Sequence, residues 1–382
     1  MSAADNTLKF VRAAQMYGLH RAYAKAAGRL NADLRVFPPG LPKDRDVSLI
    51  GCGQFGFASI SYFVGKKFGN RFRLCFDIAR DRAVKLCRAY RYNAVAGGAD
   101  ELLTDPATKF VYIASNHATH TPYAVKALRA GKSVHIEKPV ATSWEQLSEL
   151  ARTVEDTANV PVIGYNRPFS AAVRLLDRTV SGSANPMTVS CIIAGHMLRP
   201  DHWYRNAEEG TRICGNVAHW LDLSVHMLNL GSLANFWTLR LAPSNPEDAN
   251  DNINLTLTSE RGDLVTIVLT ARLEPPEGVH ELIFVQKDDV MARIDDFQAM
   301  TLWRNQRRKN MRFRPKDVGH KAAILQMFTL DDAERKARWR NALCSSLWML
   351  TLADMVREHE TCRAFCFSDA LARVMGDTAS PA

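Results

Sequence analysis

The 382-residue chain lacks the features that mark membrane, secreted and repeat proteins. It has no run of 18 apolar residues, so no transmembrane segment is expected. Its first 30 residues lack a compact apolar segment followed by small residues, so a secretory signal peptide is not expected either. No internal repeat or low-complexity tract is present, which argues against a solenoid. We therefore expect a cytoplasmic protein.

Cysteines are few and scattered. The chain has eight, and none belongs to a C-x-x-C pair. In so long a chain this density predicts reduced and mostly buried thiols. Only Cys362 and Cys366 have the spacing to share a helix face, and without further ligands beside them we interpret them as core residues. No metal is expected.

The composition is that of a folded protein with a moderate excess of positive charge. Hydrophobic residues make up 47% and charged residues 23%, which excludes wholesale disorder, and the length predicts two or three domains. Lys and Arg number 49 against 40 Asp and Glu, a net charge of +9. That balance suits an acidic ligand, an anionic surface or nucleic acid, or reflects an unspecialised basic surface, and it selects none of these.

Three regions follow one another along the chain. Residues 1–45 are predicted to be a basic extension with one amphipathic helix over 8–30 and a Pro-rich linker over 37–42. The helix either packs on the body of the protein or contacts a membrane surface or a partner. Residues 46–165 alternate predicted strands with helices, which indicates βαβ units and a parallel sheet. The strands are 47–50, 73–77, 110–114, 133–136 and 160–164, and the helices are 57–68, 80–90, 122–130 and 143–156.

Residues 166–382 have a different pattern, with strands that follow one another and few helices between them. The predicted strands are 187–195, 236–241, 253–258, 264–271, 282–285 and 292–303, and the helices are 317–330, 332–358 and 367–375. This pattern predicts a substrate and oligomerisation domain with a large, open, mostly antiparallel sheet closed by C-terminal helices. The expected fold class is thus α/β, a Rossmann domain followed by an α+β domain.

Residues 51–56 read Gly-Cys-Gly-Gln-Phe-Gly between a predicted strand and a predicted helix. In this context the first glycine permits a tight turn, the second lets the backbone approach a pyrophosphate, and the third lets the helix pack on the strand. The helix N-terminus adds N–H donors and a positive dipole. We expect the phosphates of a dinucleotide to be held by Gly51, Gly53, Gln54, Phe55 and Gly56.

An acid ends the next predicted strand. Asp77 lies 21 residues after Gly56, where a carboxylate accepts a hydrogen bond from a ribose 2′-hydroxyl and repels a 2′-phosphate. Arg80 and Arg82 could instead bind such a phosphate. The sequence favours NAD and leaves NADP open.

Residues 130–139, Ala-Gly-Lys-Ser-Val-His-Ile-Glu-Lys-Pro, resemble the A-G-K-x-V-x-x-E-K-P block of the Gfo/Idh/MocA oxidoreductases, the glucose–fructose oxidoreductase and inositol dehydrogenase superfamily. Residues 114–120 resemble that family's post-strand loop, and residues 164–169 its Y-N-x-R-F segment. The resemblance covers about residues 46–330. It implies a site between a Rossmann domain and an open-sheet domain, where NAD(P) oxidises or reduces a sugar-like alcohol. It also implies cofactor contacts from Ser115, Asn116, His117, His120, Glu137, Lys138 and Asn166.

Lys138 takes the position of the family lysine near nicotinamide and substrate, so the resemblance implies that it is catalytic and contacts both. The chemistry agrees, because a cation there can hydrogen-bond the reacting oxygen and stabilise the alkoxide character that develops during hydride transfer. Pro139 removes one backbone donor and stiffens the strand end beside it.

Two alignments with the family's acid–base motif are open. The spacing D-x-x-x-H fits Asp222 and His226, which would share a helix face. A branch of the family reads G-G-x-R-I-x-G-E-x-C-H-F-x-D, and residues 210–222 run parallel to it. This second alignment, which we prefer, makes His219 the acid–base group and places Asp222 one turn on, where it orients that histidine or stabilises its charge. Histidine suits proton exchange at neutral pH because its ordinary pKa is near 6.5. Asn216 stands where the branch has Glu, so a carboxylate role is lost there.

Residues 199–205 resemble a substrate loop of the same branch, and their aromatic and cationic side chains suit a sugar face and an anionic group. A hydrophobic loop anchor with solvated charges is the other interpretation. Pro168 stands where a second Arg is common, which weakens a two-arginine anion clamp. The substrate contacts implied are Lys138, Arg167, Trp203, Tyr204, Arg205 and His219.

Residues 304–316 hold seven cations and no acid. We expect an exposed connection there, which is either a solvated loop or a site for an acidic partner such as an anionic lipid surface or a nucleotide-sugar-bearing assembly. Nucleic acid is not expected, because no recognised nucleic-acid fold accompanies the charge.

The functional prediction is an NAD(P)-dependent dehydrogenase acting on CH–OH groups. It would move a hydride between nicotinamide and a sugar or nucleotide-sugar hydroxyl or ketone in sugar or polysaccharide metabolism. The alternative, favoured by Asn216, is a catalytically silent dinucleotide sensor or scaffold. An open sheet with one free face predicts a homo-oligomer. Peripheral membrane contact through the N-terminal helix or residues 304–316 stays open.

Overall fold

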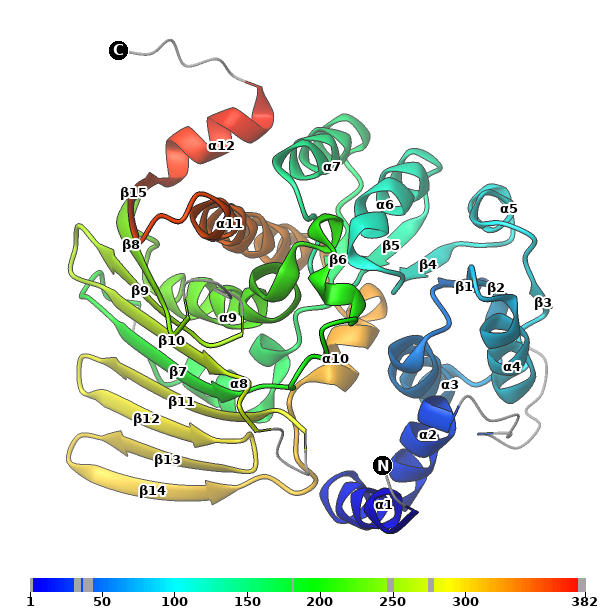
Figure 1. Ribbon diagram of the computed structural model, residues 1–382, viewed down its shortest axis with the longest axis horizontal. Helices are drawn as coiled ribbons and strands as arrows, with labels where there is room; N and C mark the ends of the chain where they lie inside the picture. Colours follow the sequence, from blue (N-terminus) through cyan, green and yellow to red (C-terminus); the bar gives the residue numbers. More distant parts are fainter. Residues whose placement is uncertain are drawn as a thin grey trace. The chain divides into compact units, whose positions relative to one another are not determined.

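The computed structural model describes residues 3–30, 36, 44–180, 182–245, 251–273 and 278–376, with the side chains of 3–9 and 30 left out. The chain divides into two compact units (Figure 1). The first unit comprises residues 1–141, 149–164 and 320–340. The second unit comprises residues 142–148, 165–319 and 341–382.

The first unit is built on a six-stranded parallel sheet; the sequence predicts the parallel sheet and five of its strands, but not β3. The strand order is β3-β2-β1-β4-β5-β6, in which the order reverses between β1 and β4. Such a doubly wound sheet binds ligands beyond the carboxyl ends of its strands at this switch point. The strands are β1 (Val47–Ile50), β2 (Phe72–Phe76), β3 (Ala94–Val95), β4 (Phe110–Ile113), β5 (Ser133–Ile136) and β6 (Val162–Ile163).

Helices accompany these strands close to the predicted ranges. The predicted helix 57–68 is a π-helix, η1 (Gly56–Ser61), followed by α3 (Tyr62–Phe68). The predicted helix 317–330 is reduced to α10 (His320–Leu325) and a short 3₁₀ turn, and α10 is tied to β4 because the Tyr112 hydroxyl donates to Ile324 O at 2.6 Å. The others are α4 (Arg80–Tyr90), α6 (His120–Arg129) and α7 (Trp144–Thr157), together with α5 (Ala99–Thr104), which the sequence does not predict.

The N-terminal extension forms two helices where the sequence predicts one. Gly18 adopts a φ of +86°, a left-handed conformation that glycine enters without steric cost, and it separates α1 (Ala3–Tyr17) from α2 (Leu19–Leu30). The predicted single helix over 8–30 is therefore wrong. α2 packs against η1 and joins the core of the first unit through Ala24 and Ala27. The predicted Pro-rich linker 37–42 lies outside the described residues.

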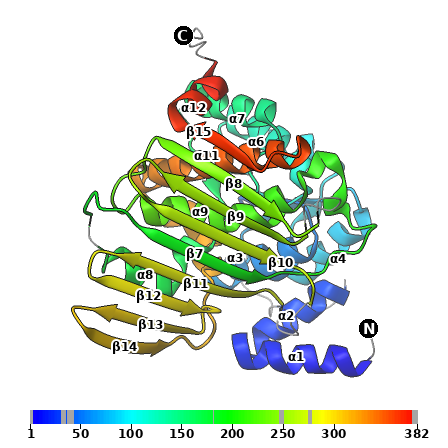
Figure 2. The same cartoon turned by 60° about the vertical axis from the view of Figure 1, so that its left-hand side comes forward.

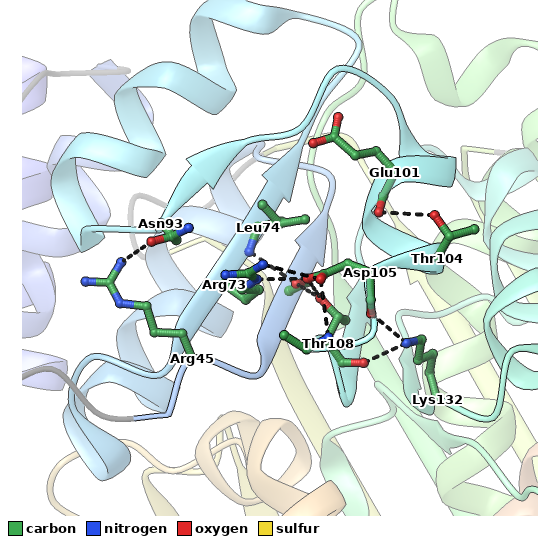
Figure 3. Close-up of polar contacts among 11 residues, drawn as sticks. Arg45, Arg73, Leu74, Asn93, Glu101, Thr104, Asp105, Thr108 and Lys132 are labelled. Atoms are coloured by element: carbon green, nitrogen blue, oxygen red, sulfur yellow. Dashed lines mark hydrogen bonds and ion pairs between the residues drawn. The ribbon is translucent and has the colours of Figure 1, made fainter.

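A polar network joins the amino ends of β2, β4 and β5 (Figure 3). The glycine-rich segment, in contrast, follows the carboxyl end of β1. Arg73 on β2 donates to both carboxylate oxygens of Asp105, at 2.8 and 3.3 Å, and Thr108 donates to the same carboxylate at 2.9 Å. Lys132 donates to the backbone carbonyls of Asp105 and Thr108, each at 2.8 Å. The Arg73 guanidinium, which hydrogen-bonds the carboxylate, lowers the pKa of Asp105.

Asp105→Asn is expected to lower the free energy of unfolding by about 1–2 kcal/mol at pH 7, because the charge-assisted bonds to Arg73 are weakened. The folded-state pKa lies below the unfolded value of about 3.9, so the stabilisation is fully present above that pH and is lost as the pH falls through the folded pKa. Urea unfolding should therefore show a difference in the free energy of unfolding between wild type and Asp105→Asn that is constant from pH 7 to about pH 4. Below about pH 4 that difference should shrink. Asp100→Asn, at an exposed pair with Lys126, is the matched control and should change nothing measurable. A difference that persists unchanged to pH 3 would contradict this account.

The second unit is built on a nine-stranded sheet in the order β14-β13-β12-β11-β7-β10-β9-β8-β15. All neighbours are antiparallel except β7 and β10, which confirms the predicted mostly antiparallel sheet. The strands are β7 (Thr188–Ala194), β8 (Phe236–Pro243), β9 (Ile253–Ser259), β10 (Leu264–Thr270), β11 (His280–Lys287), β12 (Val290–Asp295), β13 (Ala299–Arg304), β14 (Arg307–Arg312) and β15 (Cys362–Cys366).

Helices cover one face of this sheet, and Figure 2 shows α8 (Ala171–Asp177) and α9 (Ala218–Leu228) behind the strands. α11 (Asp332–Arg357) adds Trp348, whose ring packs 4.8 Å from that of Trp237 on β8. α12 (Phe367–Met375) ends the described chain. Strand residues alternate between buried and partly exposed, with Ile192 on β7 52% exposed. The sheet therefore has one covered and one open face.

Three predictions for the second unit are wrong. The predicted strand 292–303 is a hairpin, because Asp296 and Phe297 turn the chain with φ of 48° and 54° between β12 and β13. The basic run 304–316, expected to be a connection, contains the edge strand β14, and its Lys316 is buried against Asp296 at 2.6 Å. Cys362 and Cys366 begin and end the edge strand β15, so they share no helix, and Cys362 is exposed.

All eight cysteines are free thiols. Within the described ranges, no helix is both long and apolar enough to span a bilayer. The same ranges contain no cluster of three or more His, Cys, Asp or Glu side chains arranged to hold a metal ion.

Candidate functional site

The glycine-rich segment follows β1 at the switch point of the parallel sheet. Gly51 has a φ of +93°, and a Cβ there would lie 2.3 Å from Ala114 O at the end of β4. A Cβ on Gly56 would lie 2.3 Å from Gly51 O. A Cβ on Gly53, in contrast, would meet no atom within 4 Å. The first and third glycines thus serve close packing, and the second leaves open space beside backbone N–H groups, which fits a pyrophosphate.

This division gives a matched pair of substitutions. Gly56→Ala is expected to lower the free energy of unfolding by about 1–3 kcal/mol, because its methyl group overlaps a backbone oxygen that has little room to move. Gly53→Ala should unfold like the wild type yet bind NAD more weakly, because its methyl group occupies the open space. Chemical unfolding and calorimetric NAD titration of both variants separate the two effects. Equal losses of stability would refute the assignment.

Asp77 lies beside the glycine-rich segment and is hydrogen-bonded to it. Its carboxylate accepts from Cys52 N at 2.7 Å and from Ala79 N at 2.8 Å, which joins the end of β2 to the glycine-rich turn. A carboxylate offers about four acceptor positions, so two remain for a ribose hydroxyl. Arg80 and Arg82 are exposed at the start of α4.

The loop after β4 brings the predicted polar residues to the same carboxyl edge of the sheet. Ser115 Oγ accepts from the Thr119 hydroxyl at 2.7 Å, and Asn116 precedes a 3₁₀ turn that begins with the buried His117. His120 is 1% exposed, and its Nδ1 and Nε2 lie 2.8 Å from Pro139 O and 3.1 Å from Ser115 O. Burial lowers the pKa of His120 despite these carbonyls. Through these two contacts His120 links the loops after β4 and β5.

Glu137 and Lys138 follow β5 on that edge. The Glu137 carboxylate is buried, with Oε1 3.1 Å from His135 Nε2 and Oε2 accepting from Lys138 N at 3.4 Å. A Cβ on Gly164 would lie 2.5 Å from Glu137 Oε1, so the carboxylate depends on that glycine for space. Lys138 itself is half-buried. Sequence reasoning missed His135 and Gly164, although positions 135 and 137 share a face of a strand.

In the second unit, Asn166 and Arg167 lie in the interior. Asn166 donates to Val318 O at 2.5 Å, and its side-chain oxygen accepts from Arg167 at 3.2 Å. The Arg167 guanidinium pairs with both oxygens of Glu281, at 2.7 and 2.8 Å, and stacks 4.7 Å from the Trp220 ring. Glu281 also accepts from Trp220 Nε1 at 2.8 Å. The charge of Arg167 is therefore already neutralised, by a carboxylate that sequence reasoning missed.

The predicted substrate loop contains a 3₁₀ turn, Trp203–Arg205. Arg205 donates to Arg199 O at 3.0 Å and to Asp251 at 2.6 Å. Asp251 also accepts from the buried Arg212 at 2.9 Å. Trp203 and Tyr204 are half-buried, and their rings meet edge to face at 4.3 Å. Arg205 thus fits a loop anchor, while the two rings remain partly open to solvent.

Helix α9 carries the candidate acid–base residues. His219 is half-buried, with its ring edge-on to Tyr165 at 6.1 Å, and Asp222 is 4% exposed. Burial raises the pKa of Tyr165, and the Asp222 carboxylate adds to that shift. His226 Nε2 lies 2.9 Å from Asp177 on α8. Positions 219 and 226 are two turns apart, about 10 Å along the axis, so only one of them can serve a single reacting atom.

Comparison with known proteins agrees with this architecture. Residues 45–165 match an oxidoreductase family, GFO_IDH_MocA, with an NAD-binding Rossmann fold. The chain is 26% identical to scyllo-inositol 2-dehydrogenase (NAD(+)) from Bacillus subtilis over 33% of this chain and 36% of that one. It is 26% identical to inositol 2-dehydrogenase from Ralstonia nicotianae over 48% of this chain and 52% of that one. The matches thus span about a third to a half of these relatives.

The structure also resembles UDP-N-acetylglucosamine 3-dehydrogenase from Acidithiobacillus ferrooxidans, with a TM-score of 0.64 and 19% identity over 81% of this chain and 98% of that one. At that identity the likeness concerns the fold alone, and it extends over both units. The glycine-rich turn at the switch point and the E-K-P block after β5 both lie within residues 45–165, the segment that matches the oxidoreductase family with an NAD-binding Rossmann fold.

Proposed function

We propose that the chain is an NAD(P)-dependent dehydrogenase that moves a hydride between nicotinamide and a hydroxyl or ketone of a sugar, cyclitol or nucleotide sugar. The observation that carries this proposal is the glycine-rich turn, with open space at Gly53 and the half-buried Lys138 on the same carboxyl edge of the parallel sheet. The names of the relatives, two of them inositol dehydrogenases, support a polyol or sugar substrate.

Each residue has a separate role in this proposal. Gly51, Gly53 and Gly56 shape the phosphate cradle, which is the turn of residues 51–56 that would hold the pyrophosphate. Asp77 accepts a hydrogen bond from a hydroxyl of the adenosine ribose. The nicotinamide, when bound, supplies the hydride acceptor. Lys138 Nζ donates to the reacting oxygen and stabilises its developing negative charge. His219 takes the hydroxyl proton, and Asp222 stabilises the imidazolium that results.

The geometry leads us to change three of the predicted contacts. His120 links two loops instead of touching the cofactor, because both of its ring nitrogens face backbone carbonyls. Arg167 joins side chains inside the second unit and Arg205 anchors its own loop, and neither clamps an anion, because Glu281 and Asp251 neutralise them. Trp203 and Tyr204 remain the sugar-facing residues of that loop.

We propose NAD as the preferred cofactor, because the Asp77 carboxylate would repel a 2′-phosphate. The exposed Arg80 and Arg82 are the residues that would favour NADP. We further propose a cytoplasmic homo-oligomer. Free thiols and the open sheet face, with Ile192 half-exposed, support these two statements. Light scattering on the purified protein gives the oligomeric state.

The decisive experiment measures binding and turnover separately. Calorimetry with NAD and NADP should give the lower dissociation constant for NAD. Absorbance of reduced nicotinamide should then rise with at least one member of a panel of inositols, free sugars, uronates and UDP-sugars. Cofactor binding without turnover on any of them would favour the sensor or scaffold function instead. No binding of either cofactor would refute both.

A further inference from the structure

The N-terminal helical pair lies outside residues 45–165, yet it packs on the helix that begins at the glycine-rich turn. Its second helix, α2, places Ala24 and Ala27 in the core of the first unit. A Cβ on Gly28 would lie 3.2 Å from the Phe57 ring, so α2 and η1 are in close contact. The extension is thus part of the structure that surrounds the phosphate cradle.

Arg21 is the polar centre of this contact. It is 8% exposed, and its Nη2 donates to Ser59 Oγ on η1 at 3.0 Å. The guanidinium carbon lies 4.8 Å from the Tyr62 ring centroid and 4.4 Å from that of Phe63. Its Nη1 is buried and has no hydrogen-bond partner in the described part of the chain. Within that same part, no carboxylate forms an ion pair with Arg21.

A buried cation without a carboxylate is unusual, because desolvation costs several kcal/mol per ion and is ordinarily offset by a paired opposite charge. Two aromatic faces and one hydroxyl stabilise the guanidinium without cancelling its charge. Burial lowers the pKa of Arg21 to about 10, so the group is still a full cation at pH 7. The positive electrostatic potential of the Arg21 guanidinium therefore extends to neighbouring groups.

The nearest functional feature along that helix is the phosphate cradle. Ser59, the partner of Arg21, is five residues after Gln54, less than two turns along the same helical segment. Of the four intervening residues, Gly56, Phe57 and Ala58 are buried and Phe55 is half-buried, so water and salt screen the field weakly. A dianion at the cradle would feel this charge in addition to the helix dipole.

We propose that Arg21 is a cofactor-affinity residue, whose buried charge stabilises the bound pyrophosphate through space without touching it. The inference rests on the proposed dinucleotide site. Two charges at about 10–15 Å and an effective dielectric constant of about 20 interact by an amount equal to about tenfold in affinity. The N-terminal helices α1 and α2, which lie outside residues 45–165, would in this way raise the affinity for the cofactor.

The test compares a charged ligand with an uncharged fragment of it. Arg21→Met fills the same slot without charge, and we expect it to raise the dissociation constant for NAD about tenfold. The constant for adenosine, which carries no phosphate, should change less than about twofold. Arg21→Lys keeps the charge and should retain most of the NAD affinity. Arg29→Gln removes an exposed cation from the same helix and should leave both constants unchanged. Calorimetry serves for NAD and an NMR titration for the weaker adenosine.

The outcomes are distinct. Equal weakening of NAD and adenosine in Arg21→Met would mean that Arg21 only holds α2 in place, which overturns the proposal. An unchanged NAD constant would overturn it as well. If Met prevents folding, Arg21→Gln keeps a donor for Ser59 and supports the same comparison. Failure of the wild type to bind NAD would refute the cofactor site itself, while NAD binding without turnover would refute only the dehydrogenase function.

Discussion

Lys138→Ala is expected to lower kcat for sugar oxidation by about 10²–10³-fold, the usual cost of removing one donor to a developing oxyanion. The dissociation constant for NAD should change little, because the phosphate cradle and Asp77 lie on other strands of the sheet. Steady-state kinetics with the best substrate of the panel and calorimetric NAD titration give the two numbers. A loss in kcat without a loss in NAD affinity is the signature of a group that acts on the reacting oxygen.

The control for charge is Lys126→Ala. Lys126 is an exposed lysine of the same domain, paired with Asp100 at 2.8 Å on the surface, and its loss should leave kcat unchanged. Glu137→Gln is a second comparison, because the Glu137 carboxylate accepts from Lys138 N and so positions the lysine backbone. We expect an intermediate loss for that variant. An unchanged kcat in Lys138→Ala would contradict the role of Lys138 at the reacting oxygen.

His219→Ala should lower kcat by about 10²–10⁴-fold, because proton transfer by a positioned side chain contributes a factor of that size. His226→Ala should leave kcat within about twofold and instead lower the free energy of unfolding by about 1 kcal/mol, because it breaks the contact with Asp177. Both histidines lie on α9, so each variant is the control for the other. Kinetics and urea unfolding of the pair are the measurements.

The opposite result, a large kinetic loss in His226→Ala and a small one in His219→Ala, would support the D-x-x-x-H alignment. Asp222→Asn completes the comparison. It should lower kcat less than His219→Ala does, because Asp222 acts through the histidine. A loss in Asp222→Asn that exceeds the loss in His219→Ala would contradict the assigned order of roles.

The parallel sheet could be predicted from sequence because each of its longer strands is a short apolar run bounded by turn residues. β3 and α5 were missed because two and six residues are too few to show a period. The β12–β13 hairpin was missed for a different reason. Its turn uses Asp296 and Phe297 in left-handed conformations, and no glycine marks the position. Apolar alternation therefore continued through the turn without a visible break.

The candidate site shows the same contrast between local and distant information. The phosphate cradle is set by six consecutive residues, so its spacing was visible in the sequence. The states of Arg167 and Arg205 depend on Glu281 and Asp251, which lie 114 and 46 residues further along the chain. No local sequence pattern predicts a carboxylate partner so far along the chain. The sequence alone therefore could not show that both arginines are paired with carboxylates.

The two edges of the nine-stranded sheet differ in how well they resist pairing with another chain. β14 presents four cations, Arg307, Arg308, Lys309 and Arg312, and like charges oppose the addition of an identical strand. β15 has no such protection, because its one cation, Arg363, is neutralised by Glu358 and Glu360. It also carries the exposed thiol of Cys362. Aggregation or intermolecular disulfide formation during purification would therefore begin at the β15 edge.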